Sequence, residues 1–353
     1  MGSLRTFLAI TVVLSHSYGH IFVGGRLAVQ SFYVISGFLI SYILLEARSY
    51  ENLYKFYSNR ILRLFPVYYF IAFITLIYLI SQEIFIGEVE FFRTFNELNF
   101  LGKFYLIFSN IFILGQDLAF FMGFEDGNLI FKTNYSDSNP IIYTGLISQI
   151  TWTISLEILF YLIAPFILRD LKIMFALLFL SIFLRALLIY DGIGLTGGFN
   201  YRFFPLELAL FLLGAFSHQI IKPWVEKVFA KKINKLSLFF TMSFLFYCAL
   251  FSFIPGIVFN TLLVILLLII GLPLLFNFQN IYKFDSWIGK FSYPIYVAHW
   301  IILVITKDLF VEEPIFKGFI VLIPTLILAF LTENFVSSPI EKIRLKNKKT
   351  ISQ

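Results

Sequence analysis

An arginine and a histidine near the start of the chain are spaced so that they could act together. Arg5 and His16 lie near the two ends of the apolar stretch 4–18. If this stretch is a helix, eleven residues at about 100° each place both side chains within about 20° of one face, roughly 16 Å apart along the axis. Such groups inside a bilayer usually face a bundle interior or a wet cavity. The spacing therefore predicts one wall of an active site, with the neutral His16 imidazole suited to act as a general base.

A second basic pair, Arg60 and Arg63, is three residues apart and so adjacent on a helix surface. Ser58 or Asn59 could cap a helix that begins at Arg60. Two guanidinium groups at a helix N-terminus, where the dipole is already positive, favour a bound anion such as a phosphate. The alternative is that both arginines are positive-inside anchors that contact lipid headgroups.

Glu157 lies near the middle of the apolar stretch 147–168. A carboxyl group at that depth must be protonated, paired or hydrated. It could orient an imidazole or accept a hydrogen bond from a sugar hydroxyl. The alternative is a structural role as the partner of a buried arginine, either Arg185 or Arg202.

For four further polar residues within or beside apolar stretches, a structural role is the first interpretation or no role is assigned. Arg202 and Glu207 flank the start of one predicted helix and form a plausible ion pair. His299 lies inside another, where a lone histidine usually forms a hydrogen bond to a neighbouring helix, and we assign no role to His218. Three side chains are candidate donors to an oxyanion: Ser36, Tyr161 and Tyr296.

The composition places these residues in a membrane protein. Hydrophobic residues make up 59% of the chain and charged residues 14%, against about 25% charged in soluble domains. Stretches of about 20 apolar residues are long enough to span a bilayer. They predict an all-α polytopic bundle of about ten transmembrane helices, near 4–20, 26–46, 60–81, 147–168, 172–190, 203–221, 236–254, 257–277, 287–306 and 315–336.

The loop charges predict the orientation and the domain organisation. With both termini in the cytoplasm, the basic stretches 222–235 and 341–349 fall on the cytoplasmic side, as the positive-inside rule requires. The acidic region 82–146 then becomes an extracytoplasmic excursion, with 98–116 in the interface rather than across the membrane. We expect one integral membrane domain over 1–340, a basic tail over 341–353 and no appended soluble domain.

Several other classes of protein are disfavoured. The net charge of +6 comes from short loops between apolar stretches, which does not suit nucleic-acid binding. The four histidines lack the spacing of a metal site, so we expect no metal. The one cysteine, Cys248, allows no internal disulfide and no multi-cysteine metal site.

A series of motifs in chain order completes the sequence pattern. They are Arg5-(ten residues)-His16, SFYVISGFLI at 31–40, FYSNRILRLFP at 56–66, Trp152…Glu157…Phe160-Tyr161, Arg202…Glu207…Gly214 and SYPIYVAHW at 292–300. Together they resemble the acyltransferase-3 family of integral membrane acyltransferases over nearly the whole chain.

The resemblance implies a ten-helix enzyme of the bacterial cytoplasmic (inner) membrane that O-acylates, and usually O-acetylates, carbohydrate. Acceptors in that family include O-antigen, capsule and exopolysaccharide, and the acyl donor is acyl-coenzyme A. His16 corresponds to the family's essential histidine, and Arg5, Arg60 and Arg63 to its functional arginines. Many relatives also carry a C-terminal hydrolase-like domain that this sequence lacks.

These expectations combine into one mechanism with open alternatives. Arg60, Arg63 and Arg5 bind the phosphates of acetyl-coenzyme A, whose thioester reaches His16 along a shared groove. His16 then acts as the general base, or carries the acyl group as an acyl-imidazole, while Glu157 assists and Trp152 supports the acceptor. The expected partners are the lipid bilayer and a carbohydrate, free or lipid-linked. A transporter or flippase, and a non-catalytic membrane scaffold, are the alternative functions.

Overall fold

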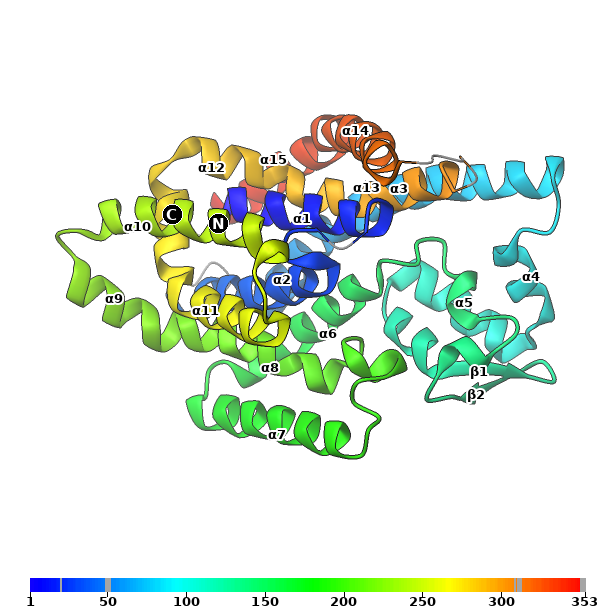
Figure 1. Ribbon diagram of the computed structural model, residues 1–353, viewed down its shortest axis with the longest axis horizontal. Coiled ribbons are helices and arrows are strands. Elements are labelled where there is room, and N and C mark those ends of the chain that lie inside the picture. The colour runs from blue at the N-terminus through cyan, green and yellow to red at the C-terminus, as the bar shows by residue number, and fades with distance from the viewer. Residues whose placement is uncertain (20, 48–51, 308, 310–312, 350–353) are drawn as a thin grey trace. The chain divides into compact units, whose positions relative to one another are not determined.

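The computed structural model describes residues 1–19, 21–47, 52–307, 309 and 313–349 of the chain. Nearly all of its regular structure there is helical, with one two-stranded hairpin (Figure 1). The chain forms two compact units, 1–67 with 210–353 and 68–209. The α-helices are α1 (Gly2–Ser17), α2 (Gly24–Ser41), α3 (Leu53–Phe85), α4 (Glu90–Glu97), α5 (Phe100–Phe112), α6 (Trp152–Ile167), α7 (Leu171–Tyr190), α8 (Phe204–Phe216), α9 (Lys222–Phe229), α10 (Ile233–Leu250), α11 (Ile257–Ile281), α12 (Lys283–Ile288), α13 (Ser292–Ile305), α14 (Pro314–Thr332) and α15 (Ser338–Lys349).

The helices confirm the prediction of a polytopic helical membrane protein. Eight helical stretches among the described residues are long and apolar enough to cross a membrane. The other two predicted spans correspond to α1 and α6, each of 16 residues or about 24 Å, which is shorter than a hydrocarbon core of about 30 Å. The predicted interfacial stretch 98–116 contains α5, which has only 13 residues. The predicted basic tail forms most of α15, and its residues 350–353 lie outside the described part.

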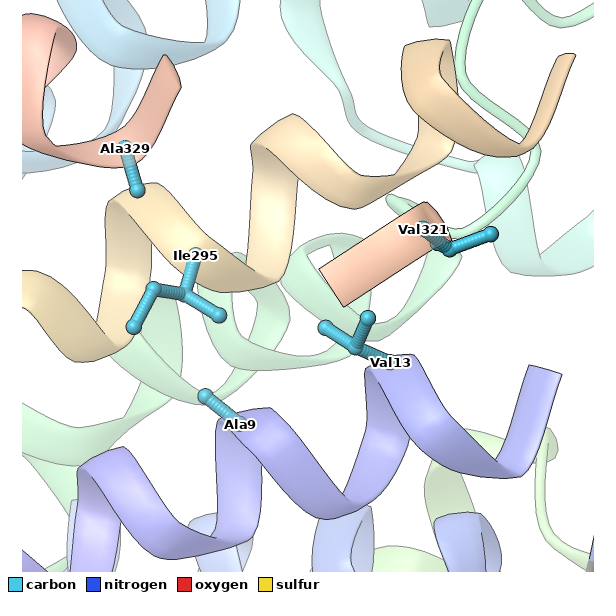
Figure 2. Close-up of a cluster of buried hydrophobic side chains, with 5 residues drawn as sticks. All are labelled: Ala9, Val13, Ile295, Val321 and Ala329. Carbon is cyan, nitrogen blue, oxygen red and sulfur yellow. The ribbon is translucent and has the colours of Figure 1, made fainter. Parts of the chain in front are cut away.

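Helix α1 lies within the first unit, in contact with α2, α12, α13 and α14. One side of it packs into a cluster of small and branched side chains from α13 and α14 (Figure 2). Ala9 and Val13 on α1 meet Ile295 on α13 and Val321 and Ala329 on α14, and each is at most 2% exposed. This packing fixes the face of α1 that carries Arg5 and His16.

The backbones of α2 and α8 touch in the first unit. A Cβ atom added to Gly37 would lie 1.8 Å from the carbonyl oxygen of Phe211, and one added to Gly214 would lie 1.9 Å from that of Val34. No side chain fits at either position, so the two glycines are what allow this close approach.

A polar cluster of the buried Ser41, His218 and Lys222 with the exposed Glu46 joins two π-helical segments, η1 (Tyr42–Glu46) after α2 and η6 (Ser217–Ile221) after α8. His218 bonds Ser41 Oγ through Nδ1 at 2.9 Å and Glu46 Oε2 through Nε2 at 3.0 Å. Lys222 Nζ lies 2.8 Å from both oxygens of Glu46. Each π-helical segment adds a residue to its turn, which lines these polar groups up. His218, to which the sequence assigned no role, is thus part of an interhelical network.

The second unit contains a compact region between α3 and α6. Strands β1 (Met122–Glu125) and β2 (Asn128–Phe131) pair antiparallel, joined by Asp126 and Gly127. Both turn residues have positive φ, as an Asp-Gly hairpin turn requires. The stretch after α5 is tied to the start of α6 through Asp117, whose Oδ1 accepts a hydrogen bond of 2.7 Å from Ser155 Oγ. Burial raises the pKa of Asp117 to about 6.

Candidate active site

Asp285, at the start of α12, holds the first turn of α1. Its carboxylate accepts hydrogen bonds from the backbone nitrogens of Gly2 at 2.7 Å and Ser3 at 2.8 Å, and from Ser3 Oγ at 2.6 Å. The Met1 nitrogen lies 3.0 Å from Oδ2. A negative charge at a helix N-terminus is favourable because it meets free amide groups and the positive end of the dipole. Asp285 therefore positions the turn that precedes Arg5. This role could not be predicted from the sequence, in which Asp285 and Arg5 are 280 positions apart.

A cavity of about 330 Å³ in the first unit brings the three predicted donor-binding arginines together. Arg5 reaches it from α1, and Arg60 and Arg63 from α3. Among the described residues that line it, five are cationic and two are carboxylates, a formal excess of three positive charges. They are Arg5, Arg60, Arg63, Lys290 and Arg344, with Glu333 and Glu341. Such a lining suits a ligand with several negative charges. Lys290 and Arg344 were not among the site residues predicted from the sequence.

The local structure at Arg60 differs from the prediction. Helix α3 begins at Leu53 rather than at Arg60, and the side chain of Asn52 accepts a hydrogen bond of 2.8 Å from the Tyr54 nitrogen at its start. No helix-breaking residue separates Leu53 from Arg60, so the helix simply continues through them. Arg60 is two turns inside α3, and any anion there is bound by side chains and not by a helix N-terminus.

Asn59 connects two of the guanidinium groups. Its Oδ1 accepts hydrogen bonds from Arg60 Nη2 at 2.8 Å and from Arg344 Nη2 at 2.9 Å. Arg60 and Asn59 are 4% and 5% exposed. One amide oxygen thus holds two cationic forks, from α3 and α15, next to each other.

His16 lies at the end of α1 with its tautomer fixed by the helix. Its Nδ1 donates to the carbonyl oxygen of Val12 at 2.8 Å, which leaves the lone pair on Nε2. The side chain is exposed, and its ring lies 5.4 Å from the ring of His299 on α13. In the neutral ring this arrangement leaves Nε2 as the nitrogen that can act as a base or a nucleophile.

His299 has the same tautomer in a different environment. Its Nδ1 donates to the carbonyl oxygen of Tyr296 at 2.6 Å, within α13, and the residue is fully buried. Among the described residues, Nε2 of His299 has no hydrogen-bond partner. The expected hydrogen bond to a neighbouring helix is therefore wrong, and the bond within α13 replaces it. The Tyr296 ring packs 5.7 Å from that of His299.

The face of α1 between the cavity and His16 is occupied by packed side chains. Ala9 and Val13 are fully buried there, against α13 and α14 (Figure 2). His16 is not one of the described residues that line the cavity. The groove that we expected to join Arg5 to His16 stays a prediction, and it requires this packing to open. Ser36, the other candidate oxyanion donor of the first unit, is buried in α2.

In the second unit Glu157 and Tyr161 form a pair on α6. The hydroxyl of Tyr161 donates to Glu157 Oε1, one helical turn away. The predicted ion pair of Arg202 with Glu207 is wrong: the fully buried Glu207 instead pairs with Arg185 at 2.6 Å. Arg185 reaches the first turn of α8 from α7 and neutralises a carboxylate that has no access to water.

Arg202 stacks on aromatic rings instead of pairing with a carboxylate. Its guanidinium carbon lies 4.3 Å from the ring centroid of Tyr201, 4.4 Å from Phe120, 5.1 Å from Trp152 and 5.6 Å from Tyr135. Rings at these distances attract a cation through their quadrupoles. The structure therefore joins Trp152 and Arg202 in one aromatic cluster. Neither Arg185 nor Arg202 is a partner of Glu157.

No group of three or more histidine, cysteine, aspartate or glutamate side chains that could hold a metal ion occurs among the described residues. The arrangement in the first unit is instead a cationic cavity and a pair of imidazoles on α1 and α13. Such groups are suited to anion binding and to proton transfer.

Comparison with known proteins identifies the family. The model of the acyltransferase domain, Acyl_transf_3, matches residues 2–333. The chain belongs to the acyltransferase-3 family. The family match thus includes every candidate site residue on α1, α3, α6, α8 and α13.

Among its relatives is the O-acetyltransferase OatA of Staphylococcus aureus (strain NCTC 8325 / PS 47), 25% identical over 371 aligned residues. That alignment covers 97% of this chain and 57% of the relative. The peptidoglycan O-acetyltransferase OatA of Listeria monocytogenes is 26% identical, with 96% and 55% covered. An uncharacterized Aquifex aeolicus protein is 26% identical, with 55% and 87% covered. The chain thus spans somewhat over half the length of the OatA proteins. No solved structure matches it.

Proposed function

We propose that the chain is a membrane O-acyltransferase that moves an acetyl group from acetyl-coenzyme A to a hydroxyl of a cell-surface carbohydrate or its lipid-linked precursor. The observation that carries the proposal is the cavity in which Arg5, Arg60 and Arg63 meet. The family and the two OatA relatives support the reaction type and a carbohydrate acceptor. The location we propose is the bacterial cytoplasmic membrane, with both ends of the chain on the cytoplasmic side.

The cavity supplies the donor site. Coenzyme A carries a diphosphate and a 3′-phosphate, and planar guanidinium groups bind phosphate oxygens through paired hydrogen bonds. Arg60 is almost fully buried, so its interaction with an anion is weakly screened by water. On the positive-inside rule this basic cavity faces the cytoplasm, where acetyl-coenzyme A is available.

His16 supplies the reactive nitrogen. In the neutral ring Nδ1 donates to Val12, so Nε2 carries the lone pair. In the direct route Nε2 takes the proton of the acceptor hydroxyl while the hydroxyl oxygen attacks the thioester carbonyl, and coenzyme A leaves as the thiol. In the two-step route Nε2 itself attacks the thioester carbonyl, the C–S bond breaks and coenzyme A leaves as the thiolate. The acceptor hydroxyl then takes the acetyl group from the acyl-imidazole, which restores the imidazole, and its proton goes to the thiolate. In the direct route, general-base catalysis by His16 contributes about 10²–10⁴-fold to the rate.

The thioester arm has to travel from the cavity to His16. Eleven residues of helix separate Arg5 from His16, about 16 Å. The intervening face of α1 is closed by Ala9 and Val13. The proposal therefore requires α13 or α14 to move away from α1 when the donor binds, a change of the kind that gates many active sites.

Purified protein in lipid nanodiscs tests the proposal with three measurements. Wild type, His16→Ala and Arg60→Ala are compared for thiol release from acetyl-coenzyme A and for donor binding by calorimetry. Mass spectrometry then compares surface glycans from cells with and without the chain. We expect His16→Ala to abolish turnover with binding retained, Arg60→Ala to weaken binding, and the glycans to differ by one acetyl group. Equal thiol release by wild type and His16→Ala contradicts the proposal.

A further inference from the structure

Among the described residues, the cavity has a fourth guanidinium group that the donor site described above does not use. Arg344, on α15, lines the cavity together with Arg60 and Arg63 of α3. It is 13% exposed at its side chain, and its neighbour Lys342 on the same helix is exposed and does not line the cavity. The orientation of α15 thus directs one particular cation of a basic helix into the site.

Asn59 sets Arg344 beside Arg60. The two Nη2 atoms lie 2.9 Å and 2.8 Å from the same Oδ1 atom. Two like charges held this close repel each other unless an anion lies between or beside them. The shared amide oxygen carries no formal charge, so it does not itself neutralise either guanidinium group.

The other side of Arg344 is occupied by a carboxylate of its own helix. Nη1 of Arg344 donates to Glu341 Oε2, three residues away on α15. Glu341 also lines the cavity, and its side chain is 42% exposed. A half-exposed carboxylate on a charged helix is a weakly held partner, because water screens the pair.

We propose that Arg344 grips the same phosphate group of the donor as Arg60, and that Glu341 takes the place of that phosphate until the donor binds. The inference rests on the proposed function and deepens it. Asn59 fixes the spacing of the two guanidinium groups, and the incoming phosphate displaces Glu341 from Nη1. A donor thioester without phosphate groups then has nothing with which to displace Glu341.

Calorimetry in phosphatidylcholine nanodiscs tests this with coenzyme A and with pantetheine, which lacks phosphate groups. We expect Arg344→Ala to weaken coenzyme A binding about tenfold or more, the loss of a charge-assisted hydrogen bond. Arg344→Lys should restore little of it, because an ammonium group lacks the fork. Glu341→Gln should tighten binding about two- to fivefold. Lys342→Ala is the matched control and should bind coenzyme A as tightly as wild type does. Towards pantetheine, all variants should have the affinity of wild type.

A double-mutant cycle decides whether the two arginines share one phosphate. The double variant Arg60→Ala with Arg344→Ala should bind coenzyme A only slightly more weakly than the single variant of lower affinity. The reason is that either substitution removes the joint contact of the two arginines with one phosphate group. Fully additive losses place the arginines on separate groups and overturn the inference. Melting temperatures of every variant, measured in the same nanodiscs, separate loss of binding from loss of folding.

The remaining outcomes separate this inference from the donor proposal. If wild type binds coenzyme A, and Arg344→Ala and Glu341→Gln bind it with the same affinity as wild type, the role of Arg344 is overturned and the donor proposal stands. If wild type does not bind coenzyme A, both fail. If added phosphatidylglycerol competes with coenzyme A through Arg344, the cavity holds a lipid headgroup and the inference is again overturned.

Discussion

Asp285→Asn is the perturbation that most directly tests how α1 is held in place. The carboxylate of Asp285 is fully buried, and the donors of Gly2, Ser3 and the Met1 nitrogen converge on its two oxygens. Asparagine keeps the shape but replaces one oxygen by an amide nitrogen, which cannot accept. About two charge-assisted hydrogen bonds are lost, each worth about 1.5–3 kcal/mol, so the free energy of unfolding falls by about 3–6 kcal/mol.

The assay is thermal unfolding followed by tryptophan fluorescence, in one detergent at one pH, together with donor binding. We expect Asp285→Asn to melt at a clearly lower temperature and to bind coenzyme A more weakly, because Arg5 follows the capped turn directly. Asp170→Asn is the control. Asp170 caps α7 through the Lys172 nitrogen at 2.7 Å but is exposed, so its loss costs only about 1 kcal/mol. Equal melting temperatures for the two variants would refute this account of the α1 cap.

Three further changes give separate readouts. Gly214→Ala should lower the melting temperature strongly, because its Cβ meets the Val34 carbonyl oxygen at 1.9 Å; a wild-type melting curve would refute the close approach of α2 and α8. Asp117→Asn should stabilise the protein at pH 8, since the pKa of Asp117 is raised to about 6 and wild type loses stability as pH rises from about 4 to 6; an unchanged pH profile of unfolding refutes this. His299→Phe should lower turnover and shift its pH profile with donor binding intact, if the lone pair on Nε2 serves the neighbouring imidazole; an unchanged profile leaves that residue purely structural.

The positions of the long apolar helices could be predicted from the sequence because hydrophobic length is a local property. Each of the ten predicted spans has a helix in the structure. The stretch 98–116 contains α5, of 13 residues, and its position in the interface stays a prediction. Residue type and motif grouped three arginines, and the structure places Arg5, Arg60 and Arg63 in one cavity; their role in donor binding stays a prediction.

The partners of individual polar groups could not be predicted, because they depend on contacts between residues that are distant in sequence. Asp285 caps a helix about 280 residues away, and Asn59 meets Arg344 across a similar separation. Glu207 pairs with Arg185 and not with Arg202, which is nearer in sequence. The aromatic rings around Arg202 already stabilise its charge. Sequence proximity favoured the wrong pair in that case.

The central claim is that His16 and the cationic cavity serve one donor. Single-turnover reaction with radiolabelled acetyl-coenzyme A in nanodiscs, with an acceptor glycan present, tests it most directly. The account predicts that acetyl transfer is lost in His16→Ala at saturating donor, and that in Arg60→Ala it recovers as the donor concentration is raised. Transfer at the wild-type rate by His16→Ala, or a loss in Arg60→Ala that no donor concentration restores, would contradict it.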